Sequence, residues 1–94
     1  MIIGACMLRL HLPGCMSLKG KRSRLKPLLA RLHREFNVAA AEVGLQDVWQ
    51  SADIAVVAVA NETAAVEARL DQIVKWIEHS WPDVEVMETQ LEFR

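Results

Sequence analysis

The chain has 94 residues, of which 52% are apolar and 24% charged, and its net charge at pH 7 is −1. This length excludes a second hydrophobic core, because domains commonly hold about 50 to 250 residues, so we expect a single domain over residues 1–94. The apolar start has no basic leader and is too short to span a bilayer, and the two cysteines, Cys6 and Cys15, match no zinc or redox spacing. We therefore expect a cytoplasmic protein with free, buried or half-buried thiols and no metal or cofactor.

Residues 2–12 predict the first strand. Two sets of side chains alternate along it, Leu8, Leu10 and Leu12 on one side and Met7, Arg9 and His11 on the other. This is the period of a strand with one buried face. Pro13 and Gly14 should end the strand, because proline cannot donate to a strand ladder and glycine tolerates turn geometry.

Residues 18–36 predict a helix with one apolar and one basic side. Its expected core residues fall within roughly 60° of one another on a helical wheel, and they are Leu18, Leu25, Leu29, Leu32 and Phe36. The rest of its surface holds seven of the eleven Lys and Arg of the chain, Lys19, Lys21, Arg22, Arg24, Lys26, Arg31 and Arg34. We expect Ser17 to cap the helix, Pro27 to bend it, and Asn37 to close it in a left-handed conformation.

Charge is divided unevenly along the chain. Residues 1–34 hold eight bases and no acid, whereas residues 35–94 hold three bases and twelve acids. Net charge near zero therefore conceals a molecule with one basic end.

The remaining elements are two strands, a helix and a last strand. We expect strands over 38–43 and 52–60, the second apolar on both faces and therefore covered on both. A helix over 62–80 should follow, capped by Asn61, with a core stripe of Val66, Leu70, Ile73, Ile77 and Trp81. Residues 84–93 alternate again, and their glutamates suit a protected edge strand.

The order strand, helix, strand, strand, helix, strand is that of the α+β ferredoxin-like fold, βαββαβ. Both helices should lie on one face of a four-stranded antiparallel sheet. The other face should be either wet or covered by a partner.

Three separated motifs resemble the bacterial YlxP-like family of domains of unknown function. They are Ser17-Leu18-Lys19-x-Lys21-Arg22, Phe36-Asn37-Val38 with Ala41-Glu42-Val43, and Gln46-Asp47-Val48-Trp49-Gln50. The resemblance covers nearly the whole chain and implies a small ferredoxin-like protein. It also implies a link to translation, because the family's genes commonly lie beside those for translation initiation and ribosome-binding factors. The resemblance carries over no catalytic residue. The family-motif positions are Ser17, Asn37, Glu42, Asp47, Trp49 and Gln50, and the resemblance assigns no function to the loop that Asp47, Trp49 and Gln50 would shape.

RNA or ribosome binding through the basic helix is the first functional prediction. Seven bases in one helix can neutralise several phosphates, in a contact that weakens steeply with salt. Residues 2–12 and 52–60 contain no aromatic residue, which excludes base stacking on the central strands of the sheet, and Trp49 is the one candidate stacking group. In the competing interpretation these bases are solvated charges that pair with the acidic second helix.

A homodimeric scaffold, or a module that binds an acidic protein, is the alternative prediction. The doubly apolar strand 52–60, the loop 46–50 and Trp76 could form a self-complementary surface with Trp49 at its centre. Either tryptophan could equally shield the core or a loop. For Glu42, a salt bridge to the basic helix is expected rather than a metal site shared with Asp47.

Catalysis is not expected. Acylphosphatase has this fold and size, but it needs a nest of backbone N–H groups and an arginine before the first helix, and residues 13–17 offer one glycine and no arginine. His11, His33 and His79 fall on three different elements and form no catalytic spacing with a nucleophile.

Overall fold

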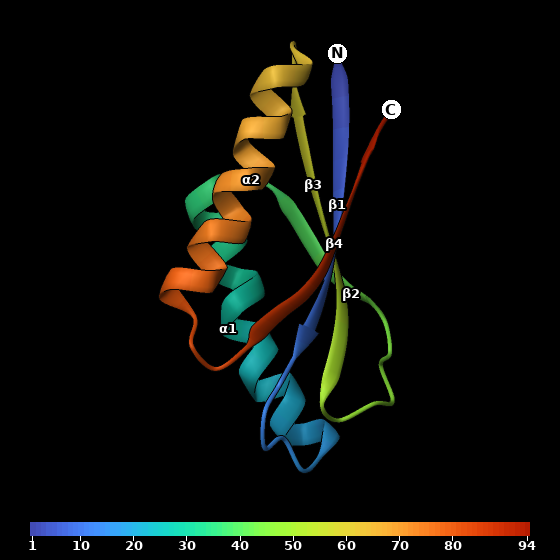
Figure 1. Ribbon diagram of the computed structural model, residues 1–94, viewed down its shortest axis with the longest axis vertical. Helices are drawn as coiled ribbons and strands as arrows, with labels where there is room; N and C mark the ends of the chain where they lie inside the picture. Colours follow the sequence, from blue (N-terminus) through green and yellow to red (C-terminus); the bar gives the residue numbers. More distant parts are fainter.

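Six elements of secondary structure follow one another in the computed structural model, which describes all 94 residues. In chain order they are β1 (Ile2–His11), α1 (Leu18–Phe36), β2 (Ala39–Gly44), β3 (Ser51–Ala60), α2 (Thr63–Ser80) and β4 (Glu85–Phe93). The strands form one antiparallel sheet in the order β2-β3-β1-β4, and both helices lie on the same side of it (Figure 1). The predicted ferredoxin-like fold is confirmed, and each predicted boundary is within one residue of the observed one.

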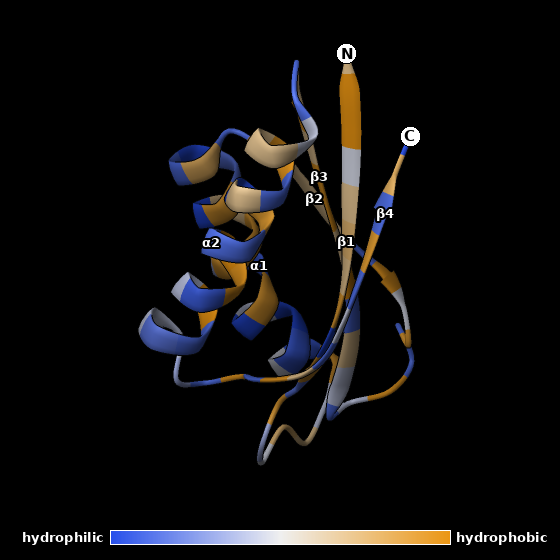
Figure 2. Cartoon of the chain, turned by 45° about the horizontal axis from the view of Figure 1, so that its top comes forward, coloured by the Kyte–Doolittle hydropathy of each residue, from blue (hydrophilic) through white to orange (hydrophobic).

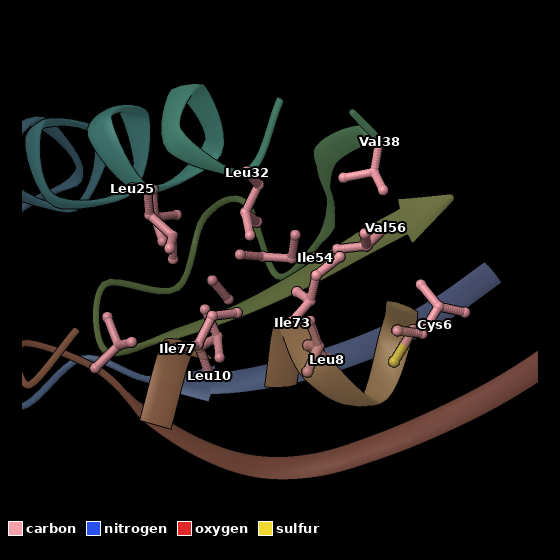
Figure 3. Close-up of a cluster of buried hydrophobic side chains, with 14 of the residues drawn as sticks. Cys6, Leu8, Leu10, Leu25, Leu32, Val38, Ile54, Val56, Ile73 and Ile77 are labelled. Atoms are coloured by element: carbon pink, nitrogen blue, oxygen red, sulfur yellow. The ribbon is translucent and has the colours of Figure 1, made fainter. Parts of the chain in front are cut away.

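The core lies between the sheet and the two helices. Figure 2, in which the ribbon is coloured by hydropathy, shows hydrophobic segments of both helices on the side nearest the sheet and hydrophilic segments on the opposite side. Helix α2 buries the stripe predicted for it, Val66, Leu70, Ile73 and Ile77. These side chains meet those of the central strands, including Leu8, Leu10, Ile54 and Val56 (Figure 3). Burying each such side chain contributes about 1.5–3 kcal/mol relative to leaving it exposed.

The buried face of helix α1 is rotated about the helix axis relative to the predicted stripe. Its fully buried apolar residues are Leu25, Leu28 and Leu32, whereas Leu29, expected in the core face, is only half-buried. The fourth buried residue of the helix is Lys21. A stripe chosen from apolar residues alone could not include a buried lysine, and it therefore misplaced the centre of the buried face.

The helix ends follow local capping rules at α1 but not at α2. The Ser17 hydroxyl accepts a hydrogen bond from the Gly20 N–H at 2.9 Å, and Asn37 closes α1 at φ 52° and ψ 52°. Both were predicted. Pro27 lies inside α1 without ending it. At α2 the expected cap was one residue off, because Glu62 rather than Asn61 is the N-cap, and no side chain caps the helix.

No helix of this chain is both long and apolar enough to cross a bilayer.

Candidate functional site

Parts of all three motifs, Lys21, Glu42 and the loop over 46–50, come together at one end of the molecule, where the start of α1 lies beside the β2–β3 loop (Figure 1), whereas Phe36-Asn37-Val38 lies at the other end of α1. The Lys21 ammonium bridges them, since its Nζ donates to the Leu45 carbonyl at 2.6 Å and lies 2.7 Å from Glu42 Oε2. At the other end of the loop, the Gln50 carbonyl accepts a hydrogen bond from the Leu12 N–H at 2.9 Å. The loop is therefore fastened to α1 at its start and to the end of β1 at its finish.

Lys21 is a structural residue in this arrangement. It is 1% exposed, and no hydrogen-bond donor other than its ammonium reaches the buried Glu42 Oε2. The predicted salt bridge of Glu42 to the basic helix is confirmed. Lys21 was expected on the anion-binding surface, but its burial and its two contacts hold its charge inside the protein. A buried charge requires such a partner, because desolvation without one is costly.

Arg24 and Arg31 lie on the side of α1 that faces α2. Arg24 donates to the carbonyls of Pro13, at 2.8 Å, and of Asp83, and so joins the β1–α1 loop to the α2–β4 loop. The Arg31 guanidinium pairs with Glu35 and lies 5.5 Å from the centre of the Trp76 ring, a cation–π distance. Both side chains are thus engaged in holding the helices and loops together.

Trp76 belongs to an aromatic cluster between the helices. Its ring meets Phe36 edge-on at 5.4 Å and Trp81 at 5.8 Å. Of the two interpretations that the sequence allowed, packing and contact surface, these distances favour packing.

The remaining bases of α1 point outward. Lys19, Arg22, Lys26 and Arg34 are exposed, and none forms an ion pair, because the ion pairs of α1 involve only Lys21 and Arg31. No ion pair joins α1 to α2. Lys19, Arg22 and Lys26 are three and four residues apart, so they form one row along the helix. We call these three residues the outer stripe.

The outer stripe borders a groove of about 420 Å³ between α1 and β2. Leu25 and Leu29 line the groove together with Ser23 and Glu42. The groove thus combines apolar side chains with three unpaired positive charges. An elongated anion could contact the charges while its less polar parts lie against the leucines.

The motif residues that neither cap a helix nor hold Lys21 lie on the β2–β3 loop. Asp47, Trp49 and Gln50 are exposed, and Trp49 keeps 48% of its surface open to solvent. Leu45, at the start of the loop, adopts φ 59°, a strained conformation for a branched residue, and the Lys21 hydrogen bond to its carbonyl helps to hold it there. Trp49 is therefore exposed on a loop whose start is held in place by Lys21.

Sequence reasoning missed one charged pair on the side of the sheet away from the helices. The Arg9 guanidinium donates from Nε and Nη2 to the two Asp53 carboxylate oxygens, at 2.8 and 3.0 Å. These hydrogen bonds lower the pKa of Asp53 and raise the pKa of Arg9. The register of β1 against β3, which pairs these two residues directly, would have revealed them, but the sequence alone did not fix that register.

The two thiols are free and buried, as predicted. Burial raises the pKa of Cys6 above its ordinary value, because desolvation disfavours the thiolate. Its sulfur is therefore a poor nucleophile in the folded protein.

Comparison with known proteins identifies the family and no function. Residues 3–91 match the model of a family described as "Protein of unknown function (DUF503)". A relative from Bacillus subtilis (strain 168), "Uncharacterized protein YlxP", is 36% identical over 77 residues, which are 82% of this chain and 83% of the relative. The family match includes helix α1 and all three motif segments. The resemblance drawn from the three motifs is confirmed, and the chain belongs to the DUF503 family.

Proposed function

We propose that this protein is a non-enzymatic RNA-binding protein that contacts the phosphates of structured RNA, such as ribosomal RNA, through the outer stripe of α1. The observation that carries the proposal is that Lys19, Arg22 and Lys26 are exposed and have no carboxylate partner. The competing interpretation required these bases to pair with acids of α2, and no such pair is present. Their charge is available to an external anion.

The contact would be electrostatic and largely independent of sequence. Each phosphate neutralised by a lysine or arginine releases condensed counterions, so that log K falls with log salt by about 0.7 to 0.9 per contact. Three stripe residues therefore predict a slope of about −2 to −3. Bases would not stack on the sheet, because β1 and β3 contain no aromatic residue. Trp49 offers one stacking surface at the same end of the molecule.

A mobility-shift titration of ribosomal RNA fragments tests the proposal over about 50 to 200 mM salt, where such contacts lose most of their affinity. The Arg22→Glu/Lys26→Glu variant should bind at least tenfold more weakly and should lose about two contacts from the salt slope. The matched control is Lys75→Glu/Arg94→Glu, which changes the net charge equally at two exposed bases outside α1. An equal loss of affinity in both variants, or no binding by the wild type at low salt, would refute the proposal.

A second experiment asks whether the RNA is ribosomal. Tagged protein in a lysate of the native host is separated on a sucrose gradient at low salt. Co-migration with small-subunit particles, lost in Arg22→Glu/Lys26→Glu and kept in the control, supports ribosomal RNA. Protein that stays at the top of the gradient in every case argues against it.

Binding of an acidic protein segment is the second candidate function, because of the free edge of β2. That strand pairs only with β3, and its single charged side chain, Glu42, is held by Lys21 beneath the helix. An extended segment could add to such an edge with its acids beside the outer stripe. Two results together would favour this candidate: a poly-glutamate peptide binds the wild type but not the Arg22→Glu/Lys26→Glu variant, and ribosomal RNA does not bind the wild type at low salt.

A further inference from the structure

The face of the sheet that turns away from the helices is apolar over most of its central area. On β1 and β3 the residues between the buried ones point to this side, and two alanines of β2 pair with them in register. We call this set the open patch, and it consists of Ile3, Ala5, Met7, Ala39, Ala41, Ala55, Val57 and Val59. No helix covers it (Figure 1). An antiparallel strand pair with a solvated face normally alternates apolar and polar residues, but here the outward residues over 3–7 of β1 and 55–59 of β3 are all apolar.

The open patch has side chains suited to packing against a second sheet of the same kind. Its side chains are small or aliphatic, and none is aromatic or charged. Sheets pack face to face about 10 Å apart, with strands nearly aligned, when their facing side chains interdigitate. A polyanion would find no charge on this patch. We propose that two copies of this chain pack against each other through the open patch, as a closed two-fold dimer.

The distribution of charge selects the orientation of the two-fold axis. On β4, beside the patch, Glu88 and Glu92 lie in register with outward-facing residues of β1, Arg9 and Ala5. An axis across the strands would place β4 over its own copy and bring these glutamates together. An axis along the strands places β4 over the partner's β2, which offers alanine and glycine there. Only the second orientation avoids the repulsion between like charges.

With the axis along the strands, between β1 and β3, the same geometry pairs opposite charges. Strand β1 of one copy then faces β3 of the other without a shift along the strands. Two residues that are neighbours in register within one chain therefore also face each other across the interface. Arg9 comes opposite the partner's Asp53, Met7 comes opposite an alanine, and Ala5 comes opposite a valine. Charge meets opposite charge and large side chains meet small ones. This self-complementarity is what a two-fold interface requires.

The area is sufficient for a stable dimer. Four strands about 4.8 Å apart, with residues rising about 3.3 Å each, give a face of roughly 600 Å² per copy. The two copies would therefore bury about 1,200 Å², the lower end of the standard interface size. Both α1 helices remain on the outer layers, so dimerisation and RNA binding by the outer stripe are independent, and either can fail alone.

Sedimentation velocity across a concentration series tests the dimer. The wild type should sediment as a dimer, and Val57→Asp, a change at an outward-facing site, should be a folded monomer by circular dichroism. Val48→Asp, at an exposed loop position outside the patch, should remain dimeric. A monomeric wild type, or a Val57→Asp variant as dimeric as the wild type, overturns the proposal.

A charge-swap experiment tests the orientation. The Arg9→Asp chain carries two carboxylates at the paired positions, and the Asp53→Arg chain carries two guanidinium groups, so each should repel its own copy. Mixed one to one, the two chains should form a heterodimer in native mass spectrometry, although the ion pair within each chain remains broken. Both chains staying monomeric in the mixture would show that β1 does not face the partner's β3.

Discussion

The two long sides of helix α1 use the same residue types in opposite ways. On the inner side Lys21, Arg24 and Arg31 are bound to carbonyls, carboxylates and indole rings of the protein itself. On the outer side the outer stripe and Arg34 are exposed and unpaired. Lys19 and Lys21 are only two residues apart, yet one is exposed and the other is 1% exposed. The number of bases in the helix therefore overestimates the positive charge that is available to an external ligand. Substitutions on the inner side should lower stability, and substitutions on the outer side should weaken ligand binding.

The sharpest way to break this comparison is to remove Lys21. Lys21→Met leaves the buried Oε2 of Glu42 without its cation, and losing one partner of a buried pair costs about 3 kcal/mol. The free energy of unfolding should fall by that amount in urea titrations. Lys19→Met, two residues away on the outer side, should change it by less than about 0.5 kcal/mol.

A double variant shows whether the cost arises from the orphaned carboxylate. Lys21→Met/Glu42→Leu should recover most of the lost stability, since a buried ion pair can often be replaced by apolar residues of similar volume. Equal urea midpoints for Lys21→Met and Lys19→Met would contradict the distinction between the two sides of the helix.

Arg24 should give the next largest effect. Arg24→Ala leaves the Pro13 and Asp83 carbonyls without their donor, and charged hydrogen bonds of this kind contribute about 1.5–3 kcal/mol, less where solvent can replace the donor. Because Arg24 is only half-buried, a loss of about 1 kcal/mol is expected. Hydrogen exchange should quicken in both loops. Arg22→Ala is the matched control, with unchanged exchange there and weaker RNA binding.

Most of the fold was predictable from sequence because each element depends on local capping rules and on a single period of its apolar residues. The alternation along β1, the apolar stripe of α2, the cap at Ser17 and the left-handed Asn37 were all predicted. What the sequence could not predict depends on distant backbone. Lys21 donates to the Leu45 carbonyl, 24 residues later in the chain, and Arg24 donates to the Asp83 carbonyl, 59 residues later. No periodicity within α1 marks either partner, so all seven bases looked alike.

Replacing Arg31 should lower the stability by a smaller amount, and tryptophan fluorescence can distinguish the two sides of the helix. Arg31→Met keeps a long apolar side chain but removes the cation beside Trp76 and the ion pair with Glu35. A half-exposed cation–π contact contributes about 0.5–1 kcal/mol, so the urea midpoint should fall slightly. Tryptophan emission of the folded protein should change, because the charge next to the ring is lost. Arg34→Met, on the outer side, should leave the emission unchanged.

The smallest expected effect concerns Arg9, a base outside α1. It tests whether pairing with a carboxylate, rather than position in the fold, decides whether a base is available to an external anion. Its partner Asp53 has a lowered pKa, so their pair stabilises the fold fully above the ordinary pKa of an aspartate and loses that contribution as pH falls through the lowered value of the folded state. Both side chains reach solvent, which keeps the contribution small. Arg9→Gln should therefore lower the melting temperature slightly at neutral pH and not at all at strongly acidic pH, at protein concentrations low enough to exclude association. A difference that persists unchanged at acidic pH would mean that Arg9 acts through packing of its side chain and not through its charge.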